Sequence, residues 1–274
     1  MTGDKCYFST GGRISQFFCY NILILLFLFA LPRKDRAMKK RIWELDALRG
    51  LCIIGMVVVH LLYDLESLLG VIRLPQGGFY DFLKDWGGLL FFLLSGICAT
   101  LGSRPVKRGL AVLTCGLIVS AVTAGMYLLG LSGRSMVIYF GVLHCLGLCM
   151  LLWPLFRRLP RWALALSAAV ILALGFYLQS RRFDTGLYLV WLGLRPYGFA
   201  TSDYFPVLPF LGFFLAGALL GRTLYARKES LLPQVDTGHF LIRFLVLCGK
   251  WSLPIYMLHQ PVLMGIVYLF TIFP

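Results

Sequence analysis

The sequence predicts an all-α protein, a polytopic transmembrane helix bundle of about seven core spans. Of its 274 residues, 59% are hydrophobic and only 14% are charged, and the mean hydropathy is +0.81. Such a composition requires lipid as the solvent. Apolar runs of helical length recur along the chain, and basic residues gather in every second connection between them.

The apolar runs place the core spans in chain order. They lie near 46–63, 87–102, 109–131, 136–156, 162–179, 204–224 and 252–273. The segment 239–249 is apolar but short, so it is either an interfacial helix or the start of the last span. No internal repeat or low-complexity linker is visible, and we therefore treat 38–274 as one transmembrane domain.

Residues 1–37 form an N-terminal extension with two interpretations. The apolar run 17–31 has about 15 residues, which is short for a span. Lys5 and Arg13 precede it, but no small-residue cleavage site follows. Met38 directly precedes KKRIWELDALRG and is a plausible start, so the extension is either an extra hydrophobic helix or the result of a mis-called start codon.

The charges of the connections orient the bundle. The net charge is +14, but no basic helix interleaved with aromatic residues occurs in a polar context, so no nucleic-acid partner is expected. The positive-inside rule places the basic connections in the cytoplasm. These connections are 32–41, 104–108, 157–161 and 222–250. The opposite side carries the acidic residues Asp64, Glu66, Asp81 and Asp85.

Arg49 and His60 are ionisable residues on one face of the first span. With ten residues between them, they lie within about 20° of each other and roughly 16 Å apart on a helix. Ionisable groups at this depth usually face the bundle interior or a water-filled cavity. The pair therefore predicts a polar site inside the bundle.

Asp64 follows His60 by one helical turn and shares its face. A carboxylate beside an imidazole orients the ring and stabilises the imidazolium, which suits a general base. The alternative is that His60 only ends the span and that Asp64 is solvated.

Arg49 also has two interpretations. In the first, it has a structural role, either in a helix pair with Asp46 or by extending into the headgroups. In the second, it binds phosphates that enter from the cytoplasm. On the next cytoplasmic turn, Arg104 and Arg108 are placed to join such an anion site.

The last span has His259 near its middle, between Pro254 and Pro261. A histidine beside broken backbone hydrogen bonds suggests a cavity wall, and the alternative is a packed histidine bonded to a freed carbonyl. His144 is similar but has no acidic neighbour, so we rank it third. No group with zinc-ligand spacing occurs, and no metal is predicted.

Three motifs, in this order, resemble those of membrane acyltransferases. ELDALRGLCIIGMVVVH, which contains Arg49 and His60, resembles a first-helix signature. LFFLLSGICATLGSR is similar to the FFxLSG second-helix motif, and GKWSLPIYMLHQPV is similar to the S-L-x-I-Y-x-x-H-x-P ending. From Met38 to its C-terminus the chain resembles the bacterial DUF1624 proteins, relatives of the heparan-alpha-glucosaminide N-acetyltransferase catalytic domain, and shares features with the acyltransferase-3 group.

The resemblance implies an acyltransferase of the bacterial inner (plasma) membrane. Cytoplasmic acetyl-CoA, as a substrate, would donate an acetyl or acyl group to an extracytoplasmic glycan or lipid of the cell envelope. His60 corresponds to the catalytic histidine and Arg49 to the coenzyme side. The resemblance to the eukaryotic heparan enzyme differs at its catalytic histidine. That histidine lies in the loop that corresponds to 64–86, and this stretch contains no histidine here.

Two other classes of function stay open. A transporter with His60, His144 and His259 along its path also fits intramembrane histidines, although no inverted repeat is visible. A non-catalytic envelope protein would tolerate substitution of Arg49 and His60.

Overall fold

The structure, a computed structural model, describes residues 42–67, 70–73, 78–183 and 186–272, and these contain helices and no strand. Its helices are α2 (Trp43–Ser67), α3 (Phe79–Leu101), α4 (Pro105–Leu128), η1 (Arg134–Met136), α5 (Val142–Phe156), α6 (Arg161–Gln179), η2 (Leu187–Leu192), α7 (Val207–Leu224), α8 (Phe240–Lys250) and α9 (Ser252–Ile272). The predicted all-α fold is confirmed. The extension 1–37, with its apolar run 17–31, lies outside the described residues.

The predicted number of about seven spans compares with five to six candidate spans among the described residues. Among the described helices, five are long and apolar enough to cross a membrane, namely α2, α3, α4, α6 and α7. Helices α8 and α9 meet at an angle of 86° and make a sixth span only as a bent pair. Helix α5 has 15 residues, and at ~1.5 Å per residue it is shorter than a ~30 Å hydrocarbon core. Seven is therefore approximate, and 239–249 is a separate helix.

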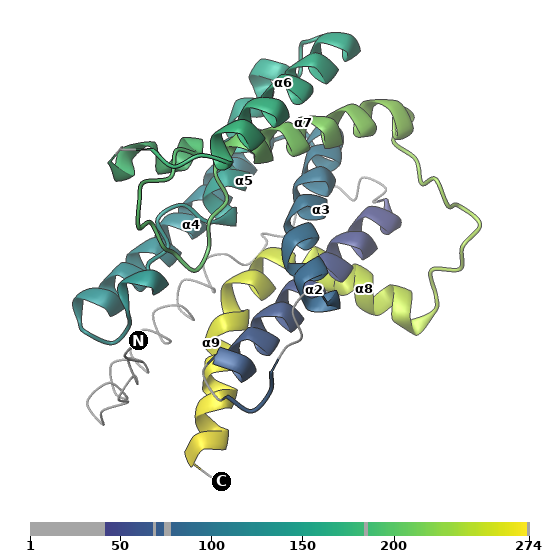
Figure 1. Ribbon diagram of the computed structural model, residues 1–274. Helices are drawn as coiled ribbons and strands as arrows, with labels where there is room; N and C mark the ends of the chain where they lie inside the picture. The colour runs from purple at the N-terminus through teal and green to yellow at the C-terminus, as the bar shows by residue number, and fades with distance from the viewer. Residues whose placement is uncertain (1–41, 68–69, 74–77, 184–185, 273–274) are drawn as a thin grey trace.

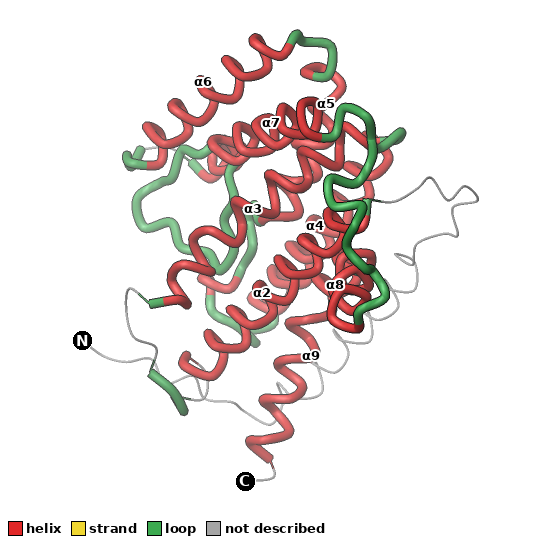
Figure 2. Tube along the Cα trace, turned by 90° about the vertical axis from the view of Figure 1, so that its right-hand side faces the viewer, coloured by secondary structure: helices red, strands yellow, loops and turns green. Residues whose placement is uncertain are grey.

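Helix α3 lies between two groups of helices. Figure 1 shows α2, α8 and α9 on one side of α3 and the layer of α4 to α7 on the other. Helix α7 packs along both α3 and α6, α4 pairs with α5, and α2 contacts both α8 and α9. In Figure 2, α2, α3, α6 and α7 rise in a similar direction, whereas Figure 1 shows α3 and α7 at a clear angle to each other.

Glycines allow α3 and α7 to lie close together. A Cβ atom on Gly96 would be 1.9 Å from the carbonyl oxygen of Phe214, and one on Gly217 would be 2.0 Å from that of Leu93. Without a hydrophobic driving force between helices in lipid, small residues stabilise a crossing by letting the backbones make contact. Phe92 and Phe214 are fully buried at this crossing, which forms the centre of the core.

Three basic connections meet at one end of the helices. Arg222, in the last turn of α7, donates from Nη1 to the carbonyl oxygen of Leu159 at 2.7 Å and from Nη2 to that of Arg157. The end of α3 lies beside the turn after α5 and the end of α7, as shown by the pocket that Thr100, Leu159 and Arg222 line together. Alternate connections of the chain thus come together in space.

Candidate active site

Two histidines from different helices lie against each other inside the bundle. The ring centroids of His60, on α2, and His259, on α9, are 4.7 Å apart, and the ring planes form an angle of 78°. The sequence predicted a site role for each of them separately. The structure brings them together, because α9 bends away from α8 and crosses α2.

Backbone carbonyls fix the tautomer of both rings. His60 Nδ1 lies 2.9 Å from the Met56 oxygen, and His259 Nδ1 lies 2.6 Å from the Tyr256 oxygen. A carbonyl only accepts, so each Nδ1 carries a hydrogen and each neutral ring has its lone pair on Nε2. The Nε2 atom of His259 is buried and has no hydrogen-bond partner among the described residues. The site therefore holds two oriented bases.

Asp64 takes a different place from the predicted one. It is only 1% exposed, so the interpretation of a solvated carboxylate is wrong. Its two oxygens accept from Gln260 Nε2 at 3.3 and 3.2 Å. Met56 rather than Asp64 holds the His60 ring, because helical side chains lean toward the preceding turn, where the residue i−4 carbonyl lies. Asp64 instead joins α2 to α9.

Asp203 and Tyr256 extend the site. The Tyr256 hydroxyl donates to Asp203 Oδ2 at 3.4 Å, and the Val142 amide donates to the same oxygen at 3.1 Å. A Cβ atom on Gly141 would lie 2.0 Å from this oxygen, so a glycine is needed for the carboxylate to reach the start of α5. Asp203 was not identifiable from the sequence, because a lone carboxylate in the connection before α7 has no pattern that distinguishes it from a solvated loop residue.

The environment of Asp203 opposes its ionisation. Burial raises the pKa of the Asp203 carboxyl above its ordinary value. The Val142 amide, the nearby charge of His60 and the Tyr256 hydroxyl favour the charged form and offset part of this effect. The native protein therefore retains a proton at Asp203 to a higher pH than the unfolded chain does.

The raised pKa of Asp203 gives a prediction for the Asp203→Asn variant. Between the unfolded pKa of about 3.9 and the raised native value, wild-type stability falls as pH rises, because the native state binds more protons. The asparagine oxygen can accept both bonds without ionising, so we expect the variant to have the higher melting temperature at neutral pH and the two proteins to converge as the pH falls toward 4. Thermal unfolding in detergent between pH 4 and 8 measures this, and a difference that does not change with pH would contradict it.

His144 is occupied by local hydrogen bonds. The Gly141 amide donates to its Nδ1 at 3.3 Å, and its Nε2 lies 3.2 Å from Ser120 Oγ. The Ser120 hydroxyl donates to the Ile138 oxygen at 2.6 Å, so His144 Nε2 must be the donor to Ser120. Both ring nitrogens are thus used in joining α4 to the start of α5, and His144 has a structural role.

Arg49 lies toward the other end of α2, roughly 16 Å from His60 by helical rise. Its guanidinium donates to Asp46 Oδ1 at 3.3 Å and to Cys98 Sγ at 2.8 Å. The predicted helix pair with Asp46 is thus present, and it is joined by a contact to α3. Arg104 and Arg108 are exposed at the start of α4. The coenzyme role of these three arginines stays a prediction.

The fold and the site together define a class of protein, a multi-pass helical membrane protein with a pair of oriented histidine bases between its helices. The chain belongs to the heparan-alpha-glucosaminide N-acetyltransferase catalytic family, whose model matches residues 41–261. The family predicted from the three motifs is confirmed, and membership indicates membrane acetyltransferase activity. Comparisons with curated proteins and with solved structures give no match.

Proposed function

We propose that the chain transfers an acetyl or acyl group from cytoplasmic acyl-CoA to a glycan or lipid acceptor on the extracytoplasmic side of the membrane. The observation that carries this proposal is the pair of Nε2 lone pairs on His60 and His259, both oriented by backbone carbonyls. Membership of the acetyltransferase family supports it.

His60 acts as the general base in this proposal. Its Nε2 atom takes the proton from the hydroxyl or amine of the acceptor while that oxygen or nitrogen bonds to the thioester carbonyl carbon. The carbon–sulfur bond then breaks, and the coenzyme A thiolate receives the proton. Asp64 and Asp203 both interact electrostatically with His60, so they stabilise the imidazolium that forms.

His259 orients the acceptor. Its buried Nε2 has no hydrogen-bond donor among the described residues. A buried acceptor without a donor costs free energy until a ligand supplies that donor. Gln260 Oε1 is a second buried acceptor that has no partner in the part of the chain that the structure describes. An acceptor with several hydroxyl or amine groups, such as a sugar, can donate to both atoms while His60 removes its proton. This need for several donors favours a glycan.

The two ends of α2 divide the work. Arg49, with Arg104 and Arg108, is assigned to the phosphates of the donor, and His60 to the acyl transfer. The positive-inside rule supports a cytoplasmic position for the arginine end. The donor would then reach His60 along the bundle.

Acetyl transfer in proteoliposomes tests the proposal. Labelled acetyl-CoA is enclosed in the vesicles and glucosamine is added outside, and we expect labelled N-acetylglucosamine outside only when the protein is present. Coenzyme A binding by the purified full-length chain is a second measurement that does not depend on the acceptor. Absence of both transfer and binding would contradict the proposal, and proton flux without transfer would favour a transporter.

A further inference from the structure

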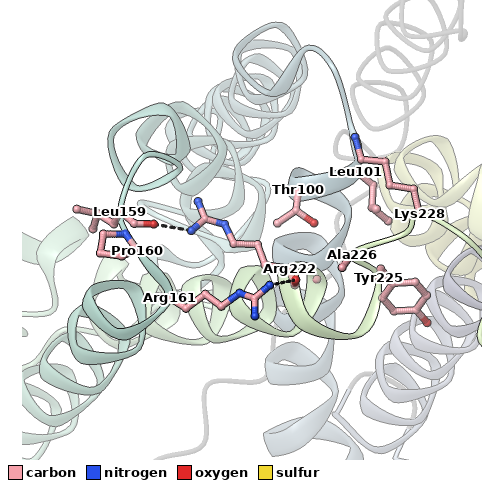
Figure 3. Close-up of a pocket in the computed structure, with 10 residues that line it drawn as sticks. Thr100, Leu101, Leu159, Pro160, Arg161, Arg222, Tyr225, Ala226 and Lys228 are labelled. Carbon is pink, nitrogen blue, oxygen red and sulfur yellow. Dashed lines mark hydrogen bonds between the residues drawn. The ribbon is translucent and has the colours of Figure 1, made fainter.

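A pocket of about 350 Å³ opens at the end of the helices where the three basic connections meet (Figure 3). It lies between the end of α3, the turn from α5 to α6, and the segment that follows α7. Arg161, Arg222 and Lys228 line it, and no carboxylate is among its described lining residues. Neither His60 nor His259 lines it, so it is separate from the candidate active site.

Arg222 is fixed at the wall of this pocket. Its Nη1 and Nη2 atoms donate to the carbonyl oxygens of Leu159 and Arg157, which close the turn after α5. Its guanidinium carbon lies 5.2 Å from the centre of the Trp153 ring. A held guanidinium keeps its positive charge in place, so a ligand would lose little side-chain entropy in meeting it.

The start of α6 adds a second source of positive potential. Its N-cap residue, Pro160, makes no side-chain capping bond, and the first backbone bond of the helix runs from the Leu164 amide to the Pro160 oxygen. The amides of residues 161–163 therefore lack intrahelical partners at the positive end of the helix dipole. The Nη2 atom of Arg161 donates to the Arg222 carbonyl oxygen at 3.5 Å. The other N–H groups of its guanidinium are left for a ligand.

The geometry points to a binding site for a phosphate-bearing anion, held by Arg161, Lys228 and the start of α6 with Arg222 at its wall. The Thr100 hydroxyl donates to the Ile97 oxygen at 2.7 Å, so it does not supply a further donor. A volume of about 350 Å³ is enough for a diphosphate or a phospholipid headgroup. The phosphate can therefore come from a soluble phosphate ester or from an anionic lipid, and the site does not depend on acetyl transfer.

Calorimetric titration of inorganic pyrophosphate into the full chain, purified in phospholipid-free detergent, tests the soluble source. We expect Arg161→Gln and Lys228→Gln each to weaken binding by about tenfold, the loss typical of one charge-assisted hydrogen bond. Arg158→Gln is the matched control, since Arg158 lies in the same turn but outside the pocket lining. An equal loss in this control would mean that only net charge matters and would overturn the proposal.

Nanodiscs test the lipid source. If the ligand is a headgroup, phosphatidylglycerol should raise the melting temperature of the wild type above its value in phosphatidylcholine, and Arg161→Gln and Lys228→Gln should lose this increase while Arg158→Gln keeps it. Pyrophosphate binding that depends on the pocket residues supports the soluble source, and lipid stabilisation that depends on them supports the headgroup. If neither ligand acts through Arg161 and Lys228, the proposal is wrong.

Discussion

Replacing His60 with asparagine is expected to lower the rate of acetyl transfer by about 10²–10⁴-fold, the usual contribution of a general base. The asparagine amide can still donate to the Met56 oxygen, as His60 Nδ1 does at 2.9 Å, so the helix keeps this hydrogen bond. The Nε2 lone pair is lost, and with it the acceptor for the proton of the substrate. Initial rates with labelled acetyl-CoA in proteoliposomes measure the effect.

Two other histidines give controls for this variant. His259→Asn is expected mainly to raise KM for the acceptor, because His259 orients the acceptor and His60 takes its proton. His239→Asn should leave the rate unchanged, since His239 is exposed at the start of α8 and its ring accepts from the local Leu241 amide. A well-folded His60→Asn protein with undiminished transfer would remove His60 from the mechanism.

Gly249→Ala is expected to destabilise the protein by about 1–3 kcal/mol, as overpacking of a close contact does. A Cβ atom there would lie 1.8 Å from the Asp46 carbonyl oxygen, and one on Gly50 would lie 2.0 Å from that of Leu245. Backbone atoms cannot rotate away, so α8 must move off α2. Because α9 follows α8 directly, we also expect His259 to move relative to His60 and the transfer rate to fall.

Gly55→Ala is the matched control on α2. Apart from its own helix backbone, no described atom lies within 4 Å of a Cβ at Gly55, and alanine favours a helix by roughly 1 kcal/mol over glycine. We expect its melting temperature to be unchanged or slightly raised, against a clear decrease for Gly249→Ala, in thermal unfolding in detergent. If both glycines tolerate alanine equally, α8 does not pack against α2 as described.

Sequence pattern was sufficient for the fold class and for the family. The length and apolarity of the runs predict helices, and each predicted span overlaps a described helix. The count of about seven spans is approximate, because α5 is short and because α8 and α9 form a bent pair. Hydropathy reports that a segment is apolar, but it does not report where a helix ends or bends, and the 86° angle between α8 and α9 depends on their packing against α2.

The site was predictable only in part. His60 and His259 are identifiable because an ionisable residue within an apolar run is costly and therefore unusual. The partners of Asp64 were not identifiable, since Gln260 is 196 residues away along the chain. Asp203 was not identifiable because nothing near it in sequence distinguishes it from a solvated loop residue.

The sequence by itself determined that this chain is a helical membrane protein of an acetyltransferase family, because helix-length apolar runs and short motifs are local properties. The tertiary structure decided which polar groups meet. It set His60 against His259, directed Asp64 to Gln260 and Asp203 to Tyr256, and gathered Arg161, Arg222 and Lys228 around one pocket. These contacts between side chains depend on where the helices cross. The close contact of Gly249 on α8 with the backbone of α2 holds these two helices together, and because α9 follows α8 directly, it also places α9 against α2.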